Sequence, residues 1–213
     1  MKTDELITLL ATGLEPADCG RPSRRLLAAW AMGTGVSLVV LAGVLRFNTA
    51  LPREVLSPMF WARAAFCTSL ALMALLAVRR LGQPGARLGV VPWGLAIPVA
   101  AMWLAATTEL VGAPAADRIR LLLGHTAFAC PWLIALLAAP LFIALIWALR
   151  SGAPTHLRLA GGAAGLAAGA GGALVYTLHC PELAPPFLSI WYVLGMLIPA
   201  GIGAGLGPRM LRW

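Results

Sequence analysis

Two cysteines that each precede a proline are the groups in this sequence best suited to chemistry. Cys130 is followed by Pro131, and Cys180 lies between His179 and Pro181. A residue before proline is restricted away from the helical conformation, so we expect both cysteines at helix ends. Two thiols can form a disulfide in an oxidising compartment, and thiolates beside imidazoles also bind soft metal ions. The pattern predicts a redox-sensitive or metal-binding site.

Histidines extend the set of candidate residues. His125 and His179 lie at the same expected depth as Cys130 and Cys180, and we consider them further members of the sensing site. Cys130, Cys180 and His179 are the candidate ligands for a metal ion, which would bind transiently rather than as a resident cofactor. When a cysteine in an apolar run has no such context, it is usually a small packed hydrophobe.

The other two cysteines receive no role. Cys67 lies in an apolar run, and Cys19 lies in the polar amino-terminal segment. Four cysteines without a CxxC pair do not make the disulfide framework of a small secreted protein.

Composition indicates what must position these residues. The 213 residues are 60% hydrophobic and 11% charged, and the mean hydropathy is +0.85. Soluble domains carry about 25% charged residues. The net charge of +8 does not come from one basic patch, because Lys and Arg lie at the ends of apolar runs. We therefore expect a multi-pass membrane protein that does not bind nucleic acid directly.

Six apolar runs, each near the roughly 20 residues that cross a bilayer, predict an all-α protein with six transmembrane helices and short loops. The runs cover residues 26–45, 60–78, 90–111, 126–149, 159–178 and 187–206. The predicted divisions are a cytoplasmic segment (1–25), a transmembrane domain (26–206) and a cytoplasmic tail (207–213). Eleven of the sixteen Lys and Arg lie on the side of the termini. This bias predicts a bacterial inner-membrane protein with both termini in the cytoplasm and Cys180 outside.

The polar amino-terminal segment predicts a short amphipathic helix over residues 1–14. Its apolar face consists of Leu6, Ile7, Leu10 and Leu14. A helix of this length is marginal alone in water, so we expect it to lie on membrane lipids or on a partner protein.

Glycines and charges inside the runs give two further predictions. Gly161, Gly165 and Gly169 in the fifth run, and Gly201 and Gly205 in the sixth, are spaced for close helix packing in lipid.

Arg63 and Glu109 lie near the outer ends of their runs and are expected to pair. No charge falls at the middle of any run, which argues against an ion-coupled transporter.

Several motifs resemble the NrsF-type transmembrane anti-sigma factors. They are the start at 1–7, the Leu-His-Cys-Pro-Glu segment at 178–182, Pro-Phe at 186–187, Trp-Tyr at 191–192, Gly-Met at 195–196 and the end at 207–213. The resemblance implies a non-enzymatic inner-membrane protein that sequesters an extracytoplasmic-function sigma factor. It also implies that one cysteine in the fourth span and one after the fifth, here Cys130 and Cys180, respond to heavy metal or oxidant.

Together these features predict that residues 1–16 hold the sigma factor and that a change at the cysteine pair releases it. Three alternatives stay open. Cys130 and Cys180 could exchange electrons in a membrane thiol oxidoreductase, although the missing CxxC weakens this interpretation. The chain could also be a small transporter, or a haem protein with His125 and His179 as axial ligands.

Overall fold

The computed structural model describes residues 3 and 5, and residues 21–83, 85, 87–152 and 154–212. Within these ranges the chain forms helices and turns and contains no strand. Six helices are long and apolar enough to cross a membrane, which confirms the predicted all-α architecture. The chain is a multi-pass membrane protein.

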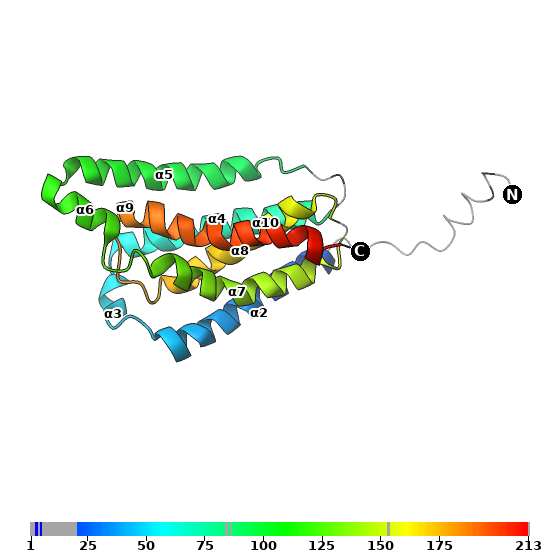
Figure 1. The fold of residues 1–213 in the computed structure, drawn as a ribbon, viewed down its shortest axis with the longest axis horizontal. Coiled ribbons are helices and arrows are strands. Elements are labelled where there is room, and N and C mark those ends of the chain that lie inside the picture. The colour runs from blue at the N-terminus through cyan, green and yellow to red at the C-terminus, as the bar shows by residue number, and fades with distance from the viewer. Residues whose placement is uncertain are drawn as a thin grey trace.

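The elements follow one another in six crossings (Figure 1). The crossings are α2 (Arg21–Val40) continued by the π-helical η1 (Leu41–Leu45), α4 (Pro58–Leu81), α5 (Val91–Gly112), α7 (Cys130–Leu149), α8 (Leu157–Tyr176), and α9 (Pro185–Phe187), η2 (Leu188–Tyr192) and α10 (Val193–Met210) in succession. Two further helices, α3 (Leu51–Glu54) and α6 (Ala115–Leu123), occupy connections that were expected to be short loops.

Local sequence explains where α4 begins and ends. Pro58 is its first residue, and the Ser57 hydroxyl accepts a hydrogen bond of 3.3 Å from the Met59 N–H. Proline suits this position because its missing N–H has no helical partner there. Arg79 and Arg80 lie in the last turn, where positive charge complements the helix dipole.

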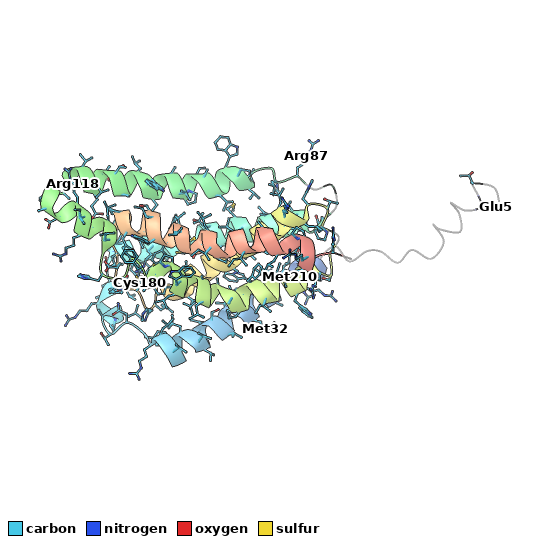
Figure 2. The ribbon with its side chains drawn as sticks, viewed as in Figure 1. Glu5, Met32, Arg87, Arg118, Cys180 and Met210 are labelled. Carbon is cyan, nitrogen blue, oxygen red and sulfur yellow. The ribbon has the colours of Figure 1, made fainter. Side chains whose placement is uncertain are left out.

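The two ends of the bundle differ in what they carry. Figure 1 shows the start of α2 and the end of α10 at one end, which we call the end with the termini, and α3, α6 and α9 at the other. We call the second end the distal end; it consists of the connections 46–57, 113–129 and 177–184. Figure 2 shows Cys180 and Arg118 toward this end, and Arg87 and Met210 at the opposite end. The compartment that each end faces stays a prediction.

Helix α8 forms the centre of the bundle. It contacts α2, α4, α7 and α10, and its apolar window is 72% buried, against 11% for α5. Alanine and glycine dominate its sequence, so neighbouring backbones can approach closely. Figure 1 shows α5 and α2 at opposite edges of the bundle.

The glycines predicted in the fifth run form the face of α8 that packs on α10. A Cβ added at Gly161 or Gly165 would overlap the carbonyl groups of Gly203 or Pro199. At Gly169 an added Cβ would lie 2.7 Å from the Met196 carbonyl oxygen. The close helix pair therefore depends on the absence of side chains at these positions.

The predicted partners in the sixth run, Gly201 and Gly205, are wrong. An added Cβ at either position would meet nothing within 4 Å. The contacting glycines are Gly203 and Gly207, each two residues further along. Two residues correspond to about 200° of helix rotation, so the two glycine sets lie on nearly opposite faces of α10.

Candidate functional site

The structure brings Cys130 and Cys180 together at the distal end. Cys130 is the first residue of α7, and Cys180 lies in the connection between α8 and α9. Both side chains have no exposed surface, and both are free thiols. The two thiols hydrogen-bond to one another. Cys130 lies at a helix end, as its following proline predicted, whereas Cys180 lies outside the helices, in the connection between α8 and α9.

Two buried tyrosines face the thiol pair. Tyr176 ends α8 and Tyr192 ends η2, and their ring centroids are 5.8 Å apart. The Tyr176 hydroxyl interacts with both thiols, and the Tyr192 hydroxyl faces Cys180. Within the described residues Tyr192 Oη has no well-aligned hydrogen-bond acceptor. Sequence reasoning did not select these tyrosines; the Trp-Tyr motif at 191–192 was the available signal.

Arg63 on α4 holds the connection that carries Cys180. Its guanidinium is fully buried and donates from Nη1 to the carbonyl oxygens of Cys180 (3.0 Å) and Glu182 (2.8 Å). Nη2 donates to the carbonyl oxygen of Thr177 (2.9 Å). Thr177 is the C-cap of α8, and carbonyls at a helix end need donors from outside the helix. One side chain thus fixes three points of a six-residue segment.

The predicted pair of Arg63 with Glu109 is wrong. The carboxylate near Arg63 is that of Glu54, with 3.7 Å between Nη2 and Oε2. Glu109 Oε2 is buried without a hydrogen-bond partner among the described residues. The connection 177–184 supplies the carbonyls that Arg63 binds, and this long-range contact has no signal in the local sequence.

His179 anchors the connection to the segment after η1. Its Nδ1 lies 2.8 Å from the carbonyl oxygen of Arg46. Because a carbonyl oxygen only accepts hydrogen bonds, Nδ1 is the ring nitrogen that carries the proton in this contact. Arg46 has φ 66°, a value that side-chain-bearing residues rarely adopt. The Asn48 N–H adds a hydrogen bond of 3.0 Å to the Leu178 carbonyl. These contacts hold both segments in one arrangement.

Glu182 anchors the connection to the turn before α7. Its Oε1 accepts a hydrogen bond of 2.7 Å from the His125 N–H. Gly124 has φ 51°, and a Cβ there would lie 2.7 Å from the Glu182 carboxyl carbon. Only glycine combines this conformation with this close approach.

The predicted imidazoles do not gather around the thiols. His179 points its Nδ1 to Arg46, and the contact that His125 makes to Glu182 uses its backbone. Among the described residues no group of three or more His, Cys, Asp or Glu is placed to hold a metal ion. The two thiols are therefore the groups that the structure offers to a soft ion, and His179 as a ligand stays a prediction.

The environment of Cys180 favours its thiolate. The hydrogen bond from Cys130 lowers the pKa of the Cys180 thiol to about 6, against burial, which raises it. The Glu182 backbone N–H, the Tyr192 hydroxyl and the Arg63 charge lower this pKa further. A thiolate is the form that attacks oxidants and binds soft metals.

The remaining candidates lie elsewhere. Cys67 is buried on α4, one helical turn after Arg63, in the same apolar cluster as Cys130 and Cys180. The predicted amphipathic helix and Cys19 lie outside the described residues. The predicted sigma-factor contacts lie there too, namely Leu6, Ile7, Leu10 and Leu14.

Sequence comparison gives the family. A sequence model of the NrsF family, described as negative regulator of sigma F, matches residues 10–213. The chain belongs to the NrsF family. It is 45% identical to the probable anti-sigma-F factor NrsF of Azospira oryzae and 39% identical to the anti-sigma-F factor NrsF of Caulobacter vibrioides. Both alignments cover the whole of both chains. No solved structure matches. The NrsF names indicate a regulatory, non-enzymatic role.

Proposed function

We propose that this chain is an anti-sigma factor that sequesters a sigma factor of the extracytoplasmic-function class. The observation that carries the proposal is the full-length similarity to two relatives named anti-sigma-F factors. The sigma factor is held at the cytoplasmic face, by residues 1–25 together with basic connections at the end of the bundle that carries the termini.

The proposed orientation places this face in the cytoplasm of a bacterial inner membrane. Eleven of the sixteen Lys and Arg lie in the segments that the sequence assigns to the side of the termini. Positively charged connections are retained in the cytoplasm during insertion. The distal end, with Cys130 and Cys180, then faces the periplasm.

The proposed trigger is a change at the Cys130–Cys180 pair. An oxidant would remove two electrons and two protons from the two thiols and leave a disulfide. A soft metal ion would instead displace protons and bind both sulfur atoms. Either product replaces the thiol hydrogen bond and changes the conformation of the connection 177–184.

We propose that α8 transmits the change at the cysteine pair to the opposite end of the bundle, where the sigma factor is held. Cys180 lies in the connection that follows α8, and the hydroxyl of Tyr176, the last residue of α8, interacts with both thiols. The glycine face of α8 carries no side chains toward the α10 backbone, which favours a small slide or rotation of one helix on the other. Coupling between the cysteine pair and the sigma-factor site requires an element that can adopt two alternative arrangements. A bias of about 1.4 kcal/mol changes sigma-factor occupancy tenfold.

A pull-down from detergent-solubilised membranes of the native host tests the proposal. We expect the tagged protein to retain a sigma factor, and to lose it after treatment with oxidant or soft metal. Retention throughout would contradict the trigger. If the protein is intact but no sigma factor is bound, the proposal that it is an anti-sigma factor is contradicted. The thiol oxidoreductase then becomes the favoured hypothesis.

Substitution of each cysteine sharpens the test. Cys130→Ser and Cys180→Ser should keep the sigma factor bound under treatment, because neither variant can form the disulfide or a two-sulfur metal site. Cys67→Ser is the matched control, since it removes a buried thiol from the same cluster and should release normally. Normal release by Cys130→Ser or Cys180→Ser would show that another group receives the signal.

A further inference from the structure

We propose that Arg63 is the positioning residue of the thiol site, holding the connection between α8 and α9 so that the Cys180 thiol meets Cys130. No sequence motif assigns this residue a role. The inference deepens the proposed function, on which its biological meaning rests. The positioning itself is a property of the isolated protein.

The argument begins with the three carbonyls that Arg63 binds. The Cys180 carbonyl, 3.0 Å from Nη1, belongs to the residue that bears the thiol. The Glu182 carbonyl (2.8 Å) and the Thr177 carbonyl (2.9 Å) lie on either side of it in sequence. Pro181 further restricts the backbone between them. With these points fixed, the backbone at Cys180 cannot move away from Cys130 without breaking guanidinium hydrogen bonds.

Arg63 is itself held by rigid surroundings. It sits in the second turn of α4, fully buried, and its guanidinium carbon lies 5.4 Å from the centroid of the Phe60 ring. A guanidinium is planar and carries five donors in a fixed fork, so it can serve several carbonyls from one position. The position of the connection 177–184 thus depends on α4 as well as on the two helices that flank it.

A competing explanation is that Arg63 serves only as the counter-charge of Glu54. The contact with Glu54 is 3.7 Å, longer than each of the three carbonyl hydrogen bonds. Glu54 Oε1 is also engaged, because it accepts a hydrogen bond of 2.7 Å from Asn48 Nδ2. The geometry favours the three carbonyls over Glu54 as the main partners of the Arg63 guanidinium. A Glu54→Gln variant separates the two explanations.

The test measures how fast Cys130 and Cys180 form a disulfide in the purified full-length protein. A diazene oxidant such as diamide takes up the two electrons and two protons that the thiols lose, and becomes a hydrazine. Mass spectrometry of the linked peptides follows the product. We expect Arg63→Met to form the disulfide about tenfold more slowly or worse, because misplaced reacting groups lose effective concentration.

Three variants define the interpretation. Arg63→Lys should fall between wild type and Arg63→Met, because an ammonium keeps the charge and three donors but lacks the fork. Glu54→Gln should stay within about twofold of wild type if the carbonyl contacts dominate. Arg53→Met is the matched control, because it removes an exposed arginine from the same end of the bundle.

A wild-type rate in Arg63→Met would overturn the proposal. If that variant does not accumulate in membranes, Arg63→Lys decides: a slower rate supports positioning by the fork, and a wild-type rate overturns it. A rate loss in Glu54→Gln as large as in Arg63→Met would overturn it in favour of the counter-charge.

The assay contains no sigma factor, so its failure is separate from failure of the proposed function. Failure of wild type to release the sigma factor contradicts the proposed trigger, failure to bind one contradicts the proposed regulator, and neither result changes the disulfide rates.

Discussion

At the scale of single residues, the thiol of Cys180 is the most reactive group that the site presents. Its pKa is lowered to about 6, first by the hydrogen bond from Cys130. An ordinary thiol has a pKa near 8.5, so at neutral pH Cys180 carries far more thiolate than a free cysteine. The buried hydroxyls of Tyr176 and Tyr192 surround a charge that burial alone would disfavour.

This environment predicts the pH dependence of alkylation at Cys180. The rate should reach half its maximum near pH 6, because only the thiolate reacts. A lowered pKa also means that the folded state gains stability at high pH, and that this gain declines as the pH falls toward 6. Iodoacetamide labelling of the membrane-embedded protein, quantified by peptide mass spectrometry, measures the midpoint.

Cys130→Ala provides the comparison for this prediction. Alanine removes the donor that lowers the pKa of Cys180, so the Cys180 midpoint should move to higher pH. A midpoint that is unchanged in Cys130→Ala would show that the two thiols do not interact as the structure has them.

At the scale of elements, the contact between α8 and α10 is the one most sensitive to added atoms. Gly165 lies directly against the Pro199 backbone, and an added Cβ would overlap it. Gly165→Ala should therefore separate the helices and destabilise the protein by about 1–3 kcal/mol, the usual range for overpacking. Thermal unfolding in detergent, followed by circular dichroism, measures the effect.

Gly201 is the matched control on α10. An added Cβ there meets nothing within 4 Å, so Gly201→Ala removes only a helix-weakening glycine. We expect it to be neutral or stabilising by up to about 1 kcal/mol. Equal losses in both variants would contradict the close packing of Gly165 on the Pro199 backbone.

At the scale of the whole molecule, six crossings place the start of α2 and the end of α10 at one end and the thiol site at the other. The charge distribution predicts that the end with the termini is cytoplasmic. A green fluorescent protein fused after Trp213 should fluoresce, because it folds in the cytoplasm. Alkaline phosphatase fused after Leu123, at the end of α6, should be active because it requires the periplasm. The opposite pattern would reverse the orientation and place the cysteine pair in the cytoplasm.

Much of the fold follows from local sequence. An apolar run of about twenty residues crosses the bilayer because the transfer free energies of its residues add along the chain, whatever the rest does. All six crossings could be predicted for this reason. Cys130 and Cys180 were expected at helix ends because proline restricts the residue before it. The fourth crossing was predicted to begin at residue 126, but α7 begins at Cys130. The chain first makes a turn that starts at Gly124, which has φ 51°.

The partners of buried groups were decided by the tertiary structure. Arg63 binds carbonyls more than a hundred residues away and not the predicted Glu109. On α8, Gly161 meets Gly203 and Gly207, and Gly165 and Gly169 meet the backbone of Pro199 and Met196, whereas Gly201 and Gly205 meet nothing. Hydropathy along a run is a local sum, and it does not encode which face of a helix turns toward which neighbour. The sequence by itself thus determined the crossings and the chemical groups, whereas their pairing depended on how the helices pack.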